Sequence, residues 1–207
     1  SIRAAVEDSG DPFLAALKLS VAANLIDCEF RERLQPGFSL KTLLEEAPEL
    51  ELVIDQSESL RQTAAAASRI LFVHETAGEL LFDRLLIETL GKSAGSVTSV
   101  LRSTPSLGGA LEADALDLGL DKVATLTDPG VDCRGLLLGS SSDKFIEEYE
   151  AADLVIAKGQ AAFETLEEAS GGPSKEKKAV FFLLRAKCAV IAGELGVSPG
   201  DCVVERN

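Results

Sequence analysis

The sequence predicts an α/β fold of three α/β/α layers, in which helices cover both faces of a mainly parallel sheet and further helices form the N-terminal part. From residue 69 onward, short apolar runs alternate with helical segments, which is typical of a parallel sheet. Before that point apolar residues recur every three to four positions, which indicates helices. The 207 residues, 46% of them apolar, fit one sizeable core. We therefore expect a single domain over 1–207, with a helical part at 1–67 packed on an α/β core at 68–207.

Three helices are expected in the N-terminal part. Asp11 and Pro12 begin the first, because proline is favoured in the first turn of a helix. Apolar residues follow at helical spacing: Phe13, Leu14, Leu17, Val21, Leu25 and Ile26. The second helix covers 40–46. The third runs from 57 or 58 to 67, with Ser57 available as its cap.

Strands and helices alternate in the rest of the chain. Strands are expected at 69–74, 96–102, 122–126, 154–157, 179–184 and 189–192, and helices at 78–90, 111–118, 143–151 and 161–168. Two loops, 127–142 and 170–178, stand out by composition. The first is either an active-site loop or an ordinary surface loop, and the second is expected to be a solvated connector. Ligands of such sheets bind at the carboxyl ends of the strands.

Charge and cysteine content exclude several classes of protein. A net charge of −14 would repel nucleic acid and anionic membranes, so neither is expected as a partner. The four cysteines lie far apart and form no C-x-x-C pair, which argues against a zinc site or a disulfide scaffold and favours reduced thiols in a cytoplasmic protein. No apolar segment is long enough to span a bilayer. The chain begins with Ser1 and contains no methionine, which is typical of a trimmed chain.

The segment 152–164 predicts an anion-binding site. An apolar strand runs through Lys158 and Gly159 into a helix. A helix N-terminus presents free N–H groups and the positive end of its dipole, and a lysine at the turn adds a positive charge, so a phosphate group fits there. Many α/β proteins have a strand, a glycine and a helix in this order for folding reasons only, and that structural interpretation stays open.

A second junction, at 70–83, offers carboxylates. A buried strand ends in polar residues, and the helix that follows carries Glu79 and Asp83 on one face. Carboxylates at a strand end can bind a hard divalent cation. Alternatively, Glu79 interacts with the helix dipole and Asp83 is solvated or pairs with an arginine. His74 is the only histidine, so no histidine-based metal site or triad can form within the chain, and we interpret it as structural.

Other catalytic templates are absent from the sequence. It contains no G-x-S-x-G elbow, no G-x-x-x-x-G-K-[ST] phosphate loop and no G-x-G-x-x-G fingerprint after a strand. Ordinary hydrolase and dinucleotide-binding functions are therefore poorly supported.

Together the two junctions resemble the motifs of the damage-control phosphatases, a metal-dependent family associated with hydrolysis of side-product or damaged phosphometabolites. The family pattern G-N-x-I-D is similar to residues 23–27, and D-N-x-G-E-x-x-F-D is similar to residues 75–83. A third pattern, A-D-L-x-x-x-K-G-Q-G-N-F-E, is similar to residues 152–164. The C-terminal part also resembles the end of the family's sequences, so the resemblance extends over nearly the whole chain.

The resemblance implies roles for residues of all three motifs. A divalent metal, which could be Mn, Co, Ni or Mg, would polarise the phosphate and orient the attacking water. Its remaining ligands here would be Glu75, Glu79 and Asp83. Lys158 and Glu75 are the expected catalytic residues. The residues expected to bind the substrate are Asn24, Asp27, Lys158, Gly159 and Gln160.

The sequence also departs from the family at positions that hold the metal. The family's Asp-Asn pair is replaced by Glu75-Thr76, its later Asn-Asp by Gly108-Gly109, and the Gly-Asn of the lysine motif by Ala161-Ala162. Each lost oxygen ligand weakens the binding of a hard cation, and the loss of several cooperating groups lowers a rate by orders of magnitude. We therefore expect a divergent, catalytically impaired member that keeps the phosphate-binding site around Lys158 and takes a small phosphorylated metabolite.

Two alternatives stay open. One is an active metal-dependent phosphatase on small phosphometabolites, with a metal site rebuilt from Glu75, Glu79 and Asp83. The other is a non-catalytic protein-interaction subunit that uses the same fold. A fold does not by itself choose among these functions, and the oligomeric state is equally open.

Overall fold

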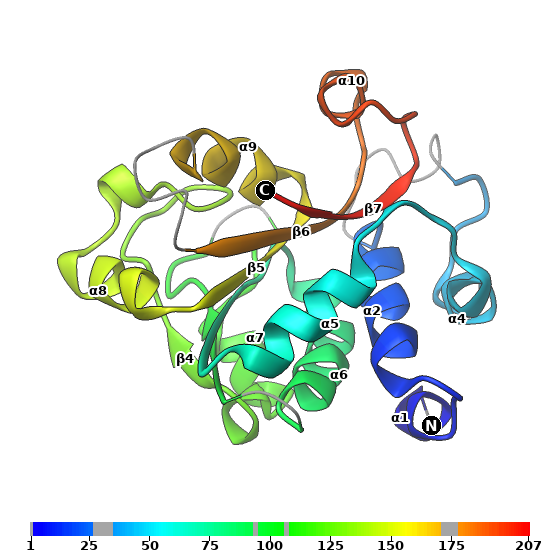
Figure 1. Ribbon diagram of the computed structural model, residues 1–207, viewed down its shortest axis with the longest axis horizontal. Coiled ribbons are helices and arrows are strands. Elements are labelled where there is room, and N and C mark those ends of the chain that lie inside the picture. Colours follow the sequence, from blue (N-terminus) through cyan, green and yellow to red (C-terminus); the bar gives the residue numbers. More distant parts are fainter. Residues whose placement is uncertain (1, 27–34, 93–94, 106–107, 171–177) are drawn as a thin grey trace.

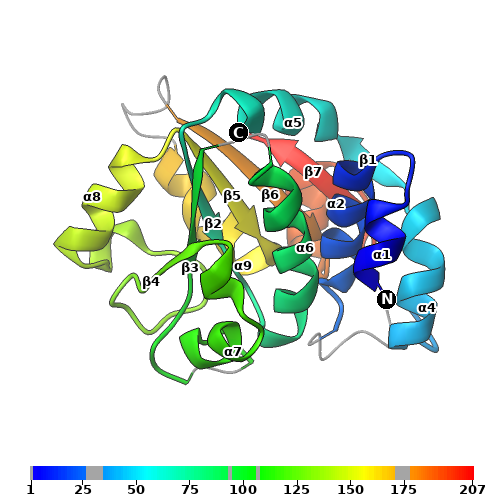
Figure 2. The same cartoon turned by 90° about the horizontal axis from the view of Figure 1, so that it is seen from below.

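Three layers make up the molecule, with a twisted sheet between two groups of helices (Figure 1). The computed structural model describes residues 2–26, 35–92, 95–105, 108–170 and 178–207. A view from below shows the long helices α2, α5 and α6 on one side of the sheet (Figure 2). The predicted α/β architecture with a mainly parallel sheet is confirmed.

The sheet has seven strands in the order β1-β7-β6-β5-β2-β3-β4 within the described ranges. The strands are β1 (Leu52–Asp55), β2 (Arg69–Val73), β3 (Ser96–Val100), β4 (Thr125–Thr127), β5 (Leu154–Lys158), β6 (Ala179–Arg185) and β7 (Cys202–Arg206). Every neighbouring pair is parallel except β6 and β7. From the centre, β2, β3 and β4 extend to one side and β5, β6 and β7 to the other. The strand order therefore switches between β2 and β5, which is where open α/β sheets bind ligands.

Two apolar cores lie on the two faces of the sheet. The first is formed with α1 (Ile2–Glu7), α2 (Pro12–Ala23), α4 (Leu40–Glu46), α5 (Ser57–Ala66), α6 (Leu80–Leu90) and α7 (Glu112–Asp117). The second is formed with α8 (Asp143–Ala151), α9 (Gly159–Ser170) and α10 (Ala189–Leu195). Because side chains alternate along a strand, Leu154 and Ile156 of β5 face the first core, whereas Val155 and Ala157 face the second.

The N-terminal helices begin as their sequence predicts. Asp11 caps α2, because its carboxylate accepts a hydrogen bond from the backbone N–H of Leu14 at 3.0 Å, and Pro12 occupies the first turn. Helix α5 starts differently from the prediction. Its N-cap is Gln56, and Ser57 instead donates its backbone N–H to the carboxylate of Asp55.

Some elements were wrongly predicted or missed. Residues 189–192, expected as a strand, begin α10, because a run of four small and branched apolar residues cannot distinguish a strand from a helix. The predicted strand 122–126 is shorter and lies later, as β4. The strands β1 and β7 and the helix α1 were not predicted. The proposed boundary at residue 67 stays a prediction, although β1 lies in the part expected to be helical.

The remaining expectations concern the loops, the thiols and the membrane. Cys133, Cys188 and Cys202 are free thiols, whereas Cys28 lies outside the described residues. Most of the predicted connector 170–178 also lies outside them. Among the helices in the described ranges, none has the length and apolar character needed to cross a bilayer.

Candidate functional site

Buried polar side chains gather at the carboxyl ends of β2 and β5, where the strand order switches. Helices α2 and α6 contribute residues from one face of the sheet, and α9 contributes its N-terminus from the other. The carboxylates come from Glu75, Glu79 and Asp83, and the cations from Lys158 and Lys187. The three motifs recognised in the sequence thus meet in one place.

Lys158 lies on the face of β5 that packs against α2 and α6, and its side chain is fully buried. Its Nζ is 2.8 Å from an oxygen of Glu79 and 2.9 Å from an oxygen of Asp83. The same ammonium donates to the backbone oxygen of Ser20 at 2.7 Å and lies 3.0 Å from its hydroxyl. All three protons of Lys158 therefore have partners within the chain.

Asp83 is held from three sides. One of its oxygens accepts from Lys158 and from the hydroxyl of Ser20, which is 2.6 Å away. The other lies 2.9 Å from Nδ1 of His74. His74 is buried, and its contact with Asp83 fits the structural role expected for it. Its Nε2 has no hydrogen-bond partner among the described residues.

Asn24 links the two glutamates. Its amide nitrogen lies 2.6 Å from Glu75 and 3.0 Å from both oxygens of Glu79, while its oxygen accepts from the backbone N–H of Arg185 at 3.1 Å. The hydroxyl of Thr76 donates to Glu79 at 2.7 Å. Asn24 is thus engaged as a structural bridge at the end of α2.

Glu75 lies at the edge of the sheet, between Asn24 at the end of α2 and the start of α9. One oxygen faces the backbone N–H of Ala161 at 3.4 Å, and the other is 2.9 Å from Nζ of Lys187. The turn at Gly159 has φ of +76°, and its Cα borders the carboxylate directly. The chain's own carboxylate therefore occupies the position beside this helix N-terminus where an external anion was expected.

The structure separates Lys158 from the helix N-terminus that follows it. Lys158 points toward α6, whereas the backbone N–H of Ala161, in the first turn of α9, faces Glu75. Lys187, which follows β6, is the lysine beside that turn. Gln160 supports it, because the Gln160 side-chain oxygen accepts from the backbone N–H of Lys187 at 2.8 Å. Asp27, expected to bind substrate, lies outside the described residues.

The packed charges shift the pKa values of the cluster. Burial opposes ionisation of Asp83, but Lys158 and the hydrogen bond from His74 together lower its pKa below the usual range. Burial, reinforced by the neighbouring carboxylates Glu75 and Asp83, raises the pKa of Glu79 in spite of Lys158. Burial likewise opposes the charge of Lys158, but Asp83 and Glu79 raise its pKa above the usual value. Lys158 is therefore a permanent countercharge.

Glu75 is ionised for a different reason. Burial would raise its pKa, but attraction to Lys187 and hydrogen bonds from Lys187, Asn24 and the backbone of Ala161 lower it. A negative charge is thus stabilised beside α9, which marks this location as suited to an anion.

Thr76 and Gly109 lie side by side, because they form an isolated antiparallel bridge. The neighbouring backbone bonds run from Ala110 N–H to the oxygen of Glu75 at 3.3 Å and from Ala77 N–H to the oxygen of Gly108 at 3.1 Å. These are the positions where the sequence resemblance places an amide and a carboxylate for a metal. Here they contribute a hydroxyl, which Glu79 already uses, and no side chain.

Two residues of the site were missed as functional candidates. Ser20 carries a hydroxyl in the last turn of the apolar helix α2, and Lys187 lies two residues after the end of a strand. Both positions carry a signal, because a polar residue in an otherwise apolar element needs a partner. Neither signal identifies the partner without the fold.

Substitution of Gly159 tests whether the turn before α9 packs directly against the Glu75 carboxylate. A Cβ built there would lie 1.9 Å from Oε2 of Glu75, and the positive φ disfavours any other residue. We expect Gly159→Ala to lower the free energy of unfolding by about 1–3 kcal/mol, measured by urea denaturation. Gly196→Ala is the matched control, because Gly196 also has a positive φ, of +69°, but no atom lies within 4 Å of its added Cβ. Equal effects at both glycines would contradict the close contact with Glu75.

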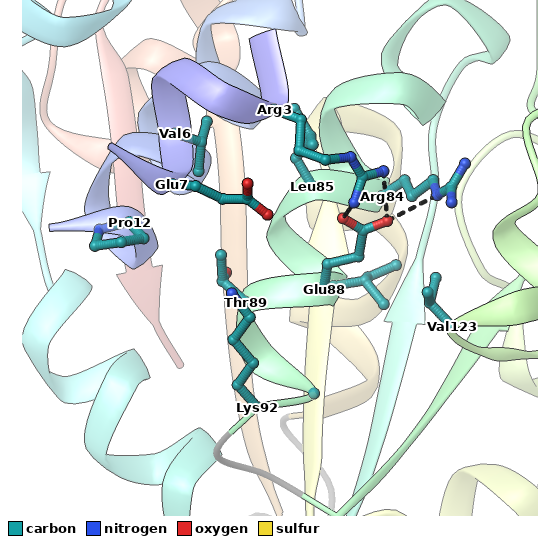
Figure 3. A pocket seen from close by; sticks show the side chains of 12 residues that line it. Arg3, Val6, Glu7, Pro12, Arg84, Leu85, Glu88, Thr89, Lys92 and Val123 are labelled. Carbon is teal, nitrogen blue, oxygen red and sulfur yellow. Dashed lines mark hydrogen bonds and ion pairs between the residues drawn. The ribbon is translucent and has the colours of Figure 1, made fainter. Parts of the chain in front are cut away.

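A separate cavity of about 490 Å³ lies between α1 and α6 (Figure 3). Glu88 lies within it and pairs with Arg3 from α1 and with Arg84 from its own helix. Because one carboxylate already accepts from both guanidinium groups, we assign this cavity to the packing of α1 on α6.

The family model for the damage-control phosphatase ARMT1-like domain matches residues 1–203, and the chain belongs to this family. Damage-control phosphatase PH1575 of Pyrococcus horikoshii is 34% identical over 199 residues, which cover 94% of this chain and 65% of that protein. The uncharacterized protein MJ0202 of Methanocaldococcus jannaschii is 33% identical over 187 residues, which cover 89% of this chain and 60% of its own length.

A solved structure gives the same result for the fold. The crystal structure of the DUF89 family protein PH1575 matches with a TM-score of 0.83 at 32% identity, covering 100% of this chain and 70% of that one. A damage-control phosphatase of Archaeoglobus fulgidus is 29% identical and is covered over 67% of its length, with 97% of this chain matched. The chain thus spans between 60% and 67% of the length of these curated relatives.

Proposed function

We propose that this chain is a divergent damage-control phosphatase domain in which metal-dependent hydrolysis is impaired, while an anion site at the start of α9 still binds a phosphorylated small molecule. The main support for this proposal is that the three carboxylates of the site already have hydrogen-bond partners within the chain. Each of the six oxygens of Glu75, Glu79 and Asp83 lies within hydrogen-bond distance of an N–H or O–H group of the chain.

The donor set does not fit a hard divalent cation. Such an ion needs about six or more oxygen ligands, and the lone pairs here are directed at lysines, amides and hydroxyls. In the described part of the chain, no group of three or more His, Cys, Asp and Glu residues is arranged to hold a metal. The side-by-side positions Thr76 and Gly109 add no carboxylate or amide oxygen. These contacts support impaired hydrolysis rather than a metal site rebuilt from Glu75, Glu79 and Asp83.

The anion site rests on a different set of groups. The N-terminus of α9, the N–H of Ala161 and the ammonium of Lys187 already stabilise one carboxylate, that of Glu75. A phosphoryl group would compete with Glu75 for these donors. The Glu75 carboxylate can move away from these donors, since it lies at the end of a flexible side chain that is 14% exposed. Lys158, buried on the other face, would act on the ligand only through the cluster that it neutralises.

An assay separates the two halves of this proposal. We expect no chelator-sensitive hydrolysis of p-nitrophenyl phosphate with Mn²⁺, Co²⁺, Ni²⁺ or Mg²⁺, but measurable binding of inorganic phosphate by titration calorimetry. Lys187→Ala should weaken that binding by about tenfold or more, because it removes a charged donor. Lys144→Ala is the matched control, since the Lys144 side chain is 84% exposed.

The opposite results are equally informative. Metal-dependent turnover that a chelator abolishes would favour an active phosphatase and contradict the impairment. Absence of phosphate binding in the wild-type protein would contradict the anion site, and would leave the interaction-subunit alternative as the better explanation of the fold.

A further inference from the structure

Arg102 carries a largely buried guanidinium whose hydrogen-bonding groups are not all satisfied by the described residues. It follows β3, only 8% of its surface is exposed, and its Nη1 is buried without a hydrogen-bond partner. No ion pair joins it to any acid among the described residues. An unpaired guanidinium is costly to bury, so such a group is expected to have a ligand or ion in the working protein.

Backbone contacts place Arg102 next to the anion site. The N–H of Ala110 bonds the oxygen of Glu75 at 3.3 Å, and the oxygen of Ala110 accepts from the N–H of Arg102 at 3.1 Å. Ala110 therefore lies between the two residues. Two strand spacings put the backbones of Glu75 and Arg102 about 10 Å apart, a distance that their long side chains can close from both ends.

The direction of the side chain also agrees with the site. Val100 packs in the core that includes residues of α9, whereas Leu101 packs in the opposite core. Because side chains alternate, Arg102 shares the face of Val100, which is also the face on which Glu75 meets α9. Figure 2 shows β2 and β3 next to each other in the sheet.

An acid that interacts electrostatically with Arg102, Asp128, already has other partners. Asp128 lies within electrostatic reach, and Arg102 contributes to lowering its pKa, after hydrogen bonds from Ser103 and Gly130 that oppose the effect of burial. Asp128 uses one oxygen for Gly130 N–H at 2.7 Å and the other for the backbone and hydroxyl of Ser103. Asp128 therefore organises the loop and leaves the guanidinium without a direct ion pair.

We propose that Arg102 is a phosphate-binding residue of this chain, placed across Glu75 from Lys187, and that the two cations together select a dianionic phosphomonoester. The inference rests on the proposed anion site at α9 and adds a second, independent donor to it. A guanidinium can give a phosphoryl group two parallel N–H bonds, whereas an ammonium acts as a point charge. A phosphoryl group bound between Arg102 and Lys187 would displace the Glu75 carboxylate and neutralise the buried charge of Arg102.

The test compares phosphate binding and thermal stability in Arg102→Gln. Titration with inorganic phosphate should show at least about tenfold weaker binding than in the wild-type protein, because a charged bidentate contact is lost. The ligand-free variant should melt at the wild-type temperature or above it, since an unpaired buried charge has been removed. Arg69→Gln is the control, because Arg69 is exposed at the other end of the neighbouring strand β2.

The other possible results of these titrations and melts would each overturn the proposed role of Arg102 or of the dianion. Weakening by Lys187→Ala but not by Arg102→Gln would overturn the inference and leave the anion site in place. Absence of phosphate binding in the wild-type protein would overturn both. A large loss of melting temperature in Arg102→Gln and also in Arg102→Met would show a structural role instead. Acetate replaces phosphate in a parallel titration, and equal binding of acetate would overturn the selection of a dianion.

Discussion

Replacing Lys158 with alanine is expected to lower the free energy of unfolding by about 3–5 kcal/mol, because it leaves two buried carboxylates without their countercharge. Lys158 is fully buried and lies within 2.9 Å of both Glu79 and Asp83. Removing one partner of a buried pair costs far more than the pair contributes, since the remaining charges stay out of water. Urea denaturation followed by circular dichroism measures the change.

Two further variants make this result specific. Lys144→Ala removes an exposed lysine that pairs with Glu148 at 3.9 Å, and it should change stability by no more than about 0.5 kcal/mol. Lys158→Met combined with Glu79→Gln and Asp83→Asn removes all three charges, and it should recover part of the loss. A Lys158→Ala protein as stable as the wild type would show that the acids find other compensation, and the interpretation of Lys158 as their countercharge would be wrong.

The second large effect is a gain of activity. Glu75→Asp, Thr76→Asn and Gly109→Asp, introduced together, return the family's residues to positions that the structure places side by side. We expect chelator-sensitive hydrolysis of p-nitrophenyl phosphate to rise about 100-fold over the wild-type protein, because oxygen ligands and preorganisation are both regained. The shorter arm at position 75 would also withdraw the carboxylate from Lys187, which frees the start of α9.

Elemental analysis gives this prediction a second readout. The triple variant should retain divalent metal after desalting, whereas the wild-type protein should not. The single variants serve as controls and should show little activity, because groups that act as a unit are strongly non-additive. A triple variant that binds metal without turnover would mean that residues beyond these three positions limit catalysis.

The sheet was largely predictable because its strands are buried on both faces. Runs such as those of β2 and β5 are almost continuously apolar, and this pattern marks a parallel strand covered by helices. The C-terminal strand β7 was not predicted, since its antiparallel pairing with β6 depends on how α10 returns the chain. The run that begins α10 is too short for its period to be read from sequence.

The composition of the site was more predictable than its arrangement. The motifs correctly bring Asn24, Glu75, Glu79 and Lys158 together, because carboxyl ends of neighbouring parallel strands share one edge. The motif does not tell which face of β5 carries the lysine. The face is set by which helices cover each side of the sheet. In this fold the side chain of Lys158 contacts α6 rather than the start of α9. Lys187 reaches the site from β6 only through tertiary structure.

The bond from Lys158 to the backbone oxygen of Ser20 has a consequence for the N-terminal helix. Ser20 is in the last turn of α2, where carbonyl groups lack partners inside the helix. A buried ammonium there acts as a helix cap supplied by a residue 138 positions away in the chain, at the negative end of the helix dipole. A strand in the middle of the sheet therefore helps to satisfy the carbonyl groups at the carboxyl end of α2.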